Sequence, residues 1–117
     1  MNIEAIRTYC LKKKGTEEAM PFGDDTLVFK VMGKMFALAN LEGALNLNLK
    51  CDPELALELR ERYPAVLPGY HMNKQHWNTI VMDGSVSGKQ VCEWIDHSYD
   101  LVVSSLTKKL REALDGL

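Results

Sequence analysis

Polar and apolar residues alternate with a period of two in one stretch in the middle of the chain. In residues 44–50 the alternation is strict, so the leucines point to one face of a strand while Asn46 and Asn48 point to the other. This pattern predicts a strand of a sheet with one buried face and one face open to water. Residues 76–82 carry the aromatic and β-branched residues typical of strands, and a second strand is predicted there.

Two further apolar segments predict a β-hairpin. Residues 26–32 and 34–40 are joined at Gly33-Lys34, which suits a two-residue turn with glycine at its first position. An additional short strand is predicted at residues 20–22, between a glycine and an acidic turn. The middle of the chain is therefore rich in strands.

A period of three to four marks the first helix. It is predicted over residues 2–14, where Asn2 can cap the helix and Gly15 can end it. The lysines at positions 12–14 fall at the negative end of the helix dipole. We interpret these lysines as a solvated helix end and not as a binding patch.

Asp52-Pro53 predicts the start of a second helix, because a capping carboxylate precedes a proline that the first helical position tolerates. That helix must end before Pro64, since the residue preceding a proline avoids helical dihedral angles. Its inward face is predicted to carry Leu55, Leu59 and the stem of Arg62.

Ser87 and Gln90 fit a capping box that opens a third, long helix. A break is predicted near Leu106-Thr107, beyond which the apolar spacing continues towards the C-terminus. Trp94 is predicted to be a core residue. The apolar stripe of this helix consists of Val91, Ile95, Ser98, Val102 and Leu106.

Composition agrees with a single domain over residues 1–117. The chain is 46% hydrophobic and 26% charged, and the order of its elements predicts an α+β fold. No apolar run approaches the roughly 20 residues that span a bilayer, and no signal segment is apparent, so we expect a cytoplasmic protein without membrane contact.

The net charge of −2 gives no overall attraction to phosphate backbones. The three cysteines, Cys10, Cys51 and Cys92, are too far apart for a disulfide framework or a metal knuckle.

No complete catalytic or metal signature occurs in the chain. Residues 84–90 stand between a strand and a helix like a phosphate-binding loop, but three residues separate the glycines where four are needed, and Gln90 replaces the metal-binding Ser or Thr. His71 and His76 could offer two imidazoles to zinc, yet such a site needs three or four ligands. We predict no metal, no cofactor and no enzyme. An enzyme with either histidine as a base would need a deep pocket around it.

The segment from Arg62 to Gly84 collects aromatic, basic and amide side chains in one short run. Such donors set among rings that can stack are what a nucleic-acid surface uses. The alternative interpretation, favoured by the residue chemistry alone, is that the aromatic residues pack this loop onto the core while its polar residues satisfy the backbone.

This run also carries a family resemblance. The consecutive PGYHMNKQHWNT at residues 68–79, followed by Ser98-Tyr99 and by Leu-Val-Val at 101–103, resembles the MmcQ/YjbR family of small bacterial proteins. The resemblance implies a frataxin-like (CyaY-like) fold, with an antiparallel sheet and helices packed on one face, described in this family as a double-wing DNA-binding arrangement. The likeness to frataxins also suggests iron binding, which in frataxins depends on an acidic first helix. The first helix predicted here has Glu4 as its only acidic residue.

Two functions are therefore expected. The first is a non-enzymatic, cytoplasmic DNA-binding protein that contacts phosphate through basic residues of this segment and its neighbours. The alternative is a module that binds a protein or a small ligand through residues 63–78 and the sheet face that carries Asn46 and Asn48. The predicted nucleic-acid-binding residues are Arg62, Tyr70, His71, Asn73, Lys74, His76, Trp77, Asn78 and Lys89.

Overall fold

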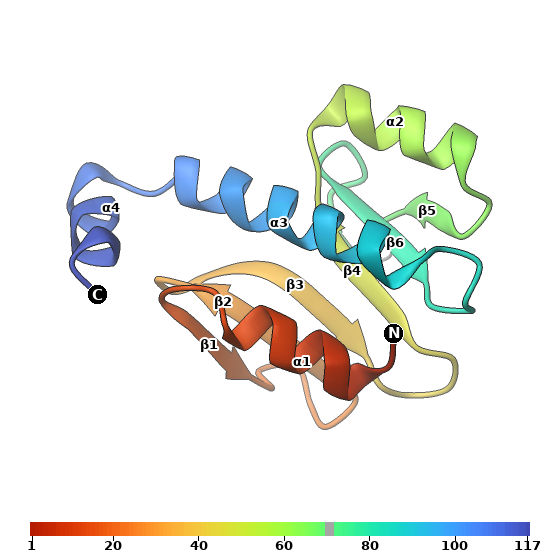
Figure 1. Cartoon of the computed structure of the whole chain (residues 1–117), viewed down its shortest axis with the longest axis horizontal. Coiled ribbons are helices and arrows are strands. Elements are labelled where there is room, and N and C mark those ends of the chain that lie inside the picture. The colour runs from red at the N-terminus through yellow and green to blue at the C-terminus, as the bar shows by residue number, and fades with distance from the viewer. Residues whose placement is uncertain (70–71) are drawn as a thin grey trace.

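The structure, a computed structural model, describes residues 1–69 and 72–117, and these contain six strands and four helices (Figure 1). The strands are β1 (Thr16–Ala19), β2 (Thr26–Val31), β3 (Lys34–Asn40), β4 (Asn46–Lys50), β5 (Val66–Pro68) and β6 (Trp77–Val81). The helices are α1 (Ile3–Leu11), α2 (Pro53–Arg62), α3 (Gly88–Ser104) and α4 (Lys108–Asp115).

The strands form one sheet in the order β1-β2-β3-β4-β6-β5. Every neighbouring pair is antiparallel, and β6 lies between β4 and the short edge strand β5. In Figure 1, α1 and α3 cross the same face of the sheet, and the buried residues of α2 belong to the same core cluster. The predicted α+β class with helices on one face of an antiparallel sheet is confirmed. The closer likeness to frataxins stays a prediction.

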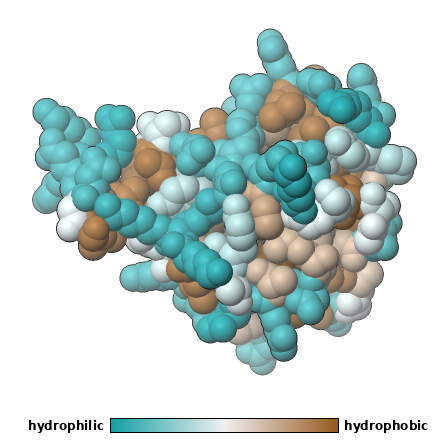
Figure 2. Space-filling model, viewed as in Figure 1, coloured by the Kyte–Doolittle hydropathy of each residue, from teal (hydrophilic) through white to brown (hydrophobic). Residues whose placement is uncertain are grey.

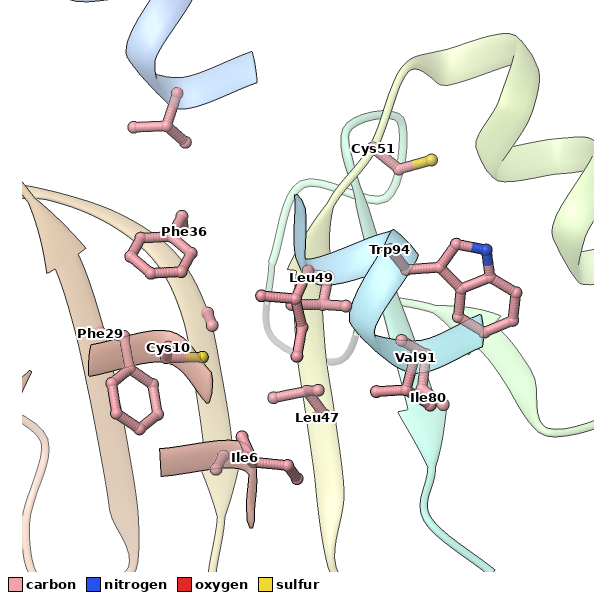
Figure 3. Close-up of a cluster of buried hydrophobic side chains, with 14 of the residues drawn as sticks. Ile6, Cys10, Phe29, Phe36, Leu47, Leu49, Cys51, Ile80, Val91 and Trp94 are labelled. Carbon is pink, nitrogen blue, oxygen red and sulfur yellow. The ribbon is translucent and has the colours of Figure 1, made fainter. Parts of the chain in front are cut away.

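The main hydrophobic core lies between the sheet and these helices. Figure 3 shows side chains of β2, β3, β4 and β6 meeting those of α1 and α3. The alternation predicted for β4 is confirmed: Leu47 and Leu49 are 0% and 2% exposed on the helix side, whereas Asn46 and Asn48 line a groove on the opposite face. A smaller apolar cluster on that opposite face consists of Val28, Leu38 and Trp77.

Ser98 joins α3 to the sheet at the point where β3 and β4 part. The paired register of these strands ends at Ala37 and Leu49, so Phe36 and Lys50 lie just beyond it. The Ser98 hydroxyl bridges them: it donates to the carbonyl oxygen of Phe36 at 2.5 Å and accepts from the backbone N–H of Lys50 at 2.9 Å. Its side chain is fully buried. The Ser98 hydroxyl thus takes the place of a direct backbone hydrogen bond between β3 and β4 at this position.

The first helix is shorter than predicted. Asn2 caps it as expected, but α1 ends at Leu11, before the lysine run. Lys13 turns instead towards α3, where its ammonium lies 2.5 Å from a carboxylate oxygen of Asp96. The same carboxylate accepts from the Tyr9 hydroxyl and raises the pKa of that phenol to about 12. Tertiary contacts, and not the helix dipole, therefore set the position of this lysine.

The hairpin turn lies one residue earlier than predicted. Its two central residues are Met32 and Gly33, both with positive φ (50° and 84°), which is the pattern of a type I′ turn. A methionine in this left-handed conformation costs about 1 kcal/mol. The backbone N–H of Met32 donates to the carbonyl of Gly15 at 3.3 Å, and its side chain packs against the main core.

Neither of the two edge strands was predicted from the sequence. The first, β1, spans residues 16–19, and the strand predicted at 20–22 is wrong. The second, β5, falls in a segment predicted as a loop, and its Pro68 is tolerated because an edge strand leaves one row of backbone groups unpaired. Such short strands carry too few residues for an alternating pattern to be visible.

The C-terminal helices agree with the prediction. Ser87 accepts from the backbone N–H of Gln90, the apolar stripe of α3 is buried, and Trp94 is 7% exposed. The predicted break occurs at residues 105–107, after α3 ends at Ser104, and the Thr107 side chain caps α4. One detail differs, since the Gln90 side chain reaches Glu93 and not back to the cap.

Candidate functional site

Arg60 organises the loop that precedes β6. Its Nε donates to Oδ1 of Asn78 at 2.7 Å, and the guanidinium also donates to the backbone carbonyls of Lys74 and Trp77. The predicted inward residue of α2 was Arg62, but Arg62 is exposed and pairs with Glu58 on its own helix. The inward arginine is two positions earlier, because the buried face of α2 is set by Ala56 and Leu59.

The loop closes tightly on β6 at Gly69. The backbone N–H of Gly69 donates to the carbonyl of Trp77 at 2.9 Å. A β-carbon at position 69 would lie 2.8 Å from that same oxygen, closer than side chains are found, so glycine is required there. The Lys74 ammonium donates to the carbonyl of Gly69 at 3.2 Å and fastens the loop from the other side.

The predicted contact residues divide by exposure. Trp77 and Asn78 are 8% and 3% exposed, and the Asn78 amide donates to the carbonyl of Ala56, so both belong to the framework. Asn73 and Lys74 are exposed. His76 is half-buried, and Tyr70 and His71 lie outside the described residues. In the described part of the loop before β6, the exposed residues are therefore 73–75.

The three cations among the predicted contact residues come from the end of α2, the loop before β6 and the first turn of α3. Lys74 precedes β6, whereas Lys89 follows the turn after β6, so the whole strand separates them. A five-residue strand spans roughly 13 Å between its end residues. Arg62 is the last residue of α2 and carries its own ion pair.

A larger concentration of positive charge lies elsewhere, and we call it the basic end: residues 12–15, 32–35 and 105–117. Two of its lysines hold these segments together. The Lys14 ammonium donates to the backbone carbonyl of Asp115 at 3.0 Å, and the Lys34 ammonium donates to that of Ser105 at 3.3 Å. Apolar contacts join the same segments around Gly15. The lysine run that was interpreted as a solvated helix end thus meets the α4 segment in space.

The basic end has a charge opposite to that of the rest of the chain. It contains seven basic and two acidic residues, which leaves seven basic and fourteen acidic residues for the remainder. Figure 2 shows hydrophilic side chains gathered over α4 at the left of the molecule. The exposed cations are Lys12, Lys14, Lys34, Lys108, Lys109 and Arg111.

The open face of the sheet holds a groove of about 510 Å³. Asn40, Asn46 and Asn48 contribute amide groups to its lining, and Asp25 and Glu42 contribute carboxylates. No described lining residue is basic. The described lining of the groove is therefore acidic, opposite in charge to the basic end.

Within the described residues, no group of three or more His, Cys, Asp or Glu side chains is placed to hold a metal ion. None of the helices in that part of the chain combines the length and apolar character needed to cross a membrane.

Two of the three thiols are buried, and we expect them to resist modification in the folded protein. Burial raises the pKa of Cys10 to about 12 and that of Cys51 to about 11, so little reactive thiolate exists at pH 8. Cys92 is half-buried, and desolvation raises its pKa as well. Reaction with a coloured disulfide reagent at pH 8 should label Cys92 at least about 100-fold faster than the other two. Equal rates for all three in the native protein would contradict the buried positions.

Fold and site define a small α+β protein with an open sheet face and a separate cationic end. The sequence model of the YjbR family matches residues 11–101, and the chain belongs to this family. It is 37% identical over 107 residues to the uncharacterised protein YbdF of Escherichia coli O157:H7, covering 91% of this chain and 88% of that one.

Further relatives cover nearly the whole chain. The uncharacterised protein YjbR of Escherichia coli K12 is 34% identical over 115 residues, which is 97% of this chain and 98% of that protein. The crystal structure of the Deinococcus radiodurans protein DR2400, described as a DUF419 domain, superposes with a TM-score of 0.92 at 39% identity, covering 97% of this chain and 88% of that one. A crystal structure of a protein from Pseudomonas syringae superposes with a TM-score of 0.76 at 31% identity, covering 86% of this chain and 98% of that one. The resemblance seen in the sequence is confirmed at the level of the family.

Proposed function

We propose that this protein binds duplex DNA without catalysis, through the phosphate backbone, and that the basic end makes the main contact. The observation that carries this proposal is the meeting of three chain segments that together contain seven basic and two acidic residues. Phosphate contacts of this kind supply most sequence-independent affinity for DNA. The double-wing arrangement implied by the family resemblance agrees with this proposal.

The placement of charge on α4 adds support. The first turn of a helix carries the positive end of the dipole and normally favours acidic residues. In α4 that turn has no acidic residue and begins with Lys108 and Lys109, both exposed. Cations at this position are locally unfavourable for the helix but favour an anion bound beside it.

The test compares two triple variants that remove the same charge from different places. One is Lys108→Gln/Lys109→Gln/Arg111→Gln, and binding of a fluorescent 20-base-pair duplex is followed by anisotropy over a range of salt. For the unmodified protein we expect affinity to fall roughly 100-fold between about 50 and 200 mM salt, which corresponds to about four phosphate contacts. The α4 variant should lower the magnitude of the salt slope by about two to three and weaken binding at least about 10-fold.

The matched control is Arg62→Gln/Lys74→Gln/Lys89→Gln, which should leave the salt slope nearly unchanged. If this control loses binding while the α4 variant retains it, the contact lies at the predicted segment and the assignment to the basic end is wrong. If the unmodified protein fails to bind at low salt, or binds without salt dependence, DNA binding itself is excluded.

A further inference from the structure

We propose that the groove on the open sheet face is a binding site for a small organic cation that carries an apolar body. This inference does not depend on DNA binding. The groove includes Asp25 and Asn40, at the start of β2 and the end of β3, whereas the basic end contains the opposite tip of the same hairpin. The two surfaces can therefore be tested separately.

The floor of the groove is a ladder of polar side chains across three strands. Asn40 of β3 lies opposite Asn46 of β4, and Asn48 of β4 lies opposite Thr79 of β6. The Thr79 hydroxyl donates to Oδ1 of Asn48 at 2.5 Å, which fixes the orientation of that amide. Amides held by neighbours on rigid strands are suited to orient a polar ligand group.

The rim of the groove is acidic and fixed by backbone contacts. The backbone N–H of Leu41 donates to the carbonyl of Asp25 at 2.7 Å, and the backbone N–H of Glu42 donates to Oδ1 of Asn40 at 3.2 Å. Both rim carboxylates belong to exposed residues, and the bond between Leu41 and Asp25 joins the two loops that carry them. Two carboxylates, with no basic residue in the described lining, favour a cation over an anion.

Apolar side chains complete the lining. Phe22 is 61% exposed beside the groove, and Leu38 and Met72 contribute further apolar surface. An exposed phenyl ring next to carboxylates can contact both the apolar body and the charged group of an amine. The volume of about 510 Å³ is within the range of small-molecule sites.

The test uses three probes with one body and different charge: 2-phenylethylamine, 2-phenylethanol and phenylacetate. Each is titrated into ¹⁵N-labelled protein, and backbone amide shifts are recorded. We expect the amine to shift Thr26, Asn48 and Thr79 with a dissociation constant of about 1 mM, as is usual for so small a ligand. It should bind at least about fivefold more tightly than the alcohol, and phenylacetate should bind most weakly.

The variant Asp25→Asn/Glu42→Gln should abolish the preference for the amine over the alcohol. Glu54→Gln/Glu61→Gln, which removes two exposed carboxylates from α2, should preserve it. Equal affinity for the three probes, shifts confined to residues outside the groove, or no shifts at all would each overturn the proposal. None of these outcomes bears on the salt-dependent binding of DNA.

Discussion

Replacing Ser98 by alanine should lower the free energy of unfolding by about 2–4 kcal/mol, the larger of the two strongest effects that we expect. The substitution leaves the carbonyl of Phe36 and the N–H of Lys50 without the hydroxyl that bridges them. Ser98 is fully buried, so water cannot easily replace the lost partner. Each buried backbone group left unpaired costs about 1–3 kcal/mol. Urea denaturation followed by circular dichroism measures the difference.

Ser104→Ala is the matched control for this change. Ser104 is exposed near the end of the same helix, and its hydroxyl donates to the carbonyl of Leu101 within that helix. Its removal should alter stability by no more than about 0.5 kcal/mol. A similar small effect at Ser98 would mean that the sheet closes without the hydroxyl bridge. The structural role assigned to this serine would then be wrong.

Arg60→Met should destabilise the protein by about 2–3 kcal/mol. Methionine keeps the apolar stem of the side chain but removes the guanidinium that donates to Asn78 and to two backbone carbonyls. Asn78 is almost completely buried, so its Oδ1 would lose a charged donor away from water. We also expect faster amide hydrogen exchange at residues 73–76, because these contacts hold the loop against β6.

Arg62→Met provides the comparison for Arg60. It makes the same chemical change two residues further along α2, where the side chain is exposed and forms an ion pair with Glu58. Exposed pairs of this type contribute about 0.3–0.5 kcal/mol, so the expected loss is small. Equal effects of the two substitutions would show that Arg60 does not organise the loop. Denaturation and hydrogen exchange can be measured on the same two samples.

The contacts of Arg60 show that several residues of the segment from Arg62 to Gly84 serve packing and not contact with a partner. Trp77, Asn78 and Gly69 are buried residues that pack with Arg60, and the exposed residues of the described loop before β6 are 73–75. Residue chemistry alone favours packing of this loop onto the core, and the burial of Trp77 and Asn78 agrees with that interpretation.

The fold also shows that positive charge is concentrated on one part of the molecule, which the net charge does not reveal. A net charge of −2 argues against binding to phosphate, but this value averages a cationic end with an acidic remainder. Electrostatic attraction acts over about 10 Å at moderate salt, so a local surface matters more than the total. The lysines of residues 12–14 and those of α4 are about a hundred positions apart, and no sequence motif joins them.

The sequence by itself determined the elements whose signals are local: the alternation of β4, the caps at Asn2, Asp52 and Ser87, and the interruption before α4. These features depend on residues within one or two turns of each other, so the pattern carries them completely. The tertiary structure alone decided the edge strands, the inward position of Arg60, the basic end and the groove. Each of these depends on contacts between segments distant in the chain, which are fixed only when the sheet order and the packing of the helices bring those segments together.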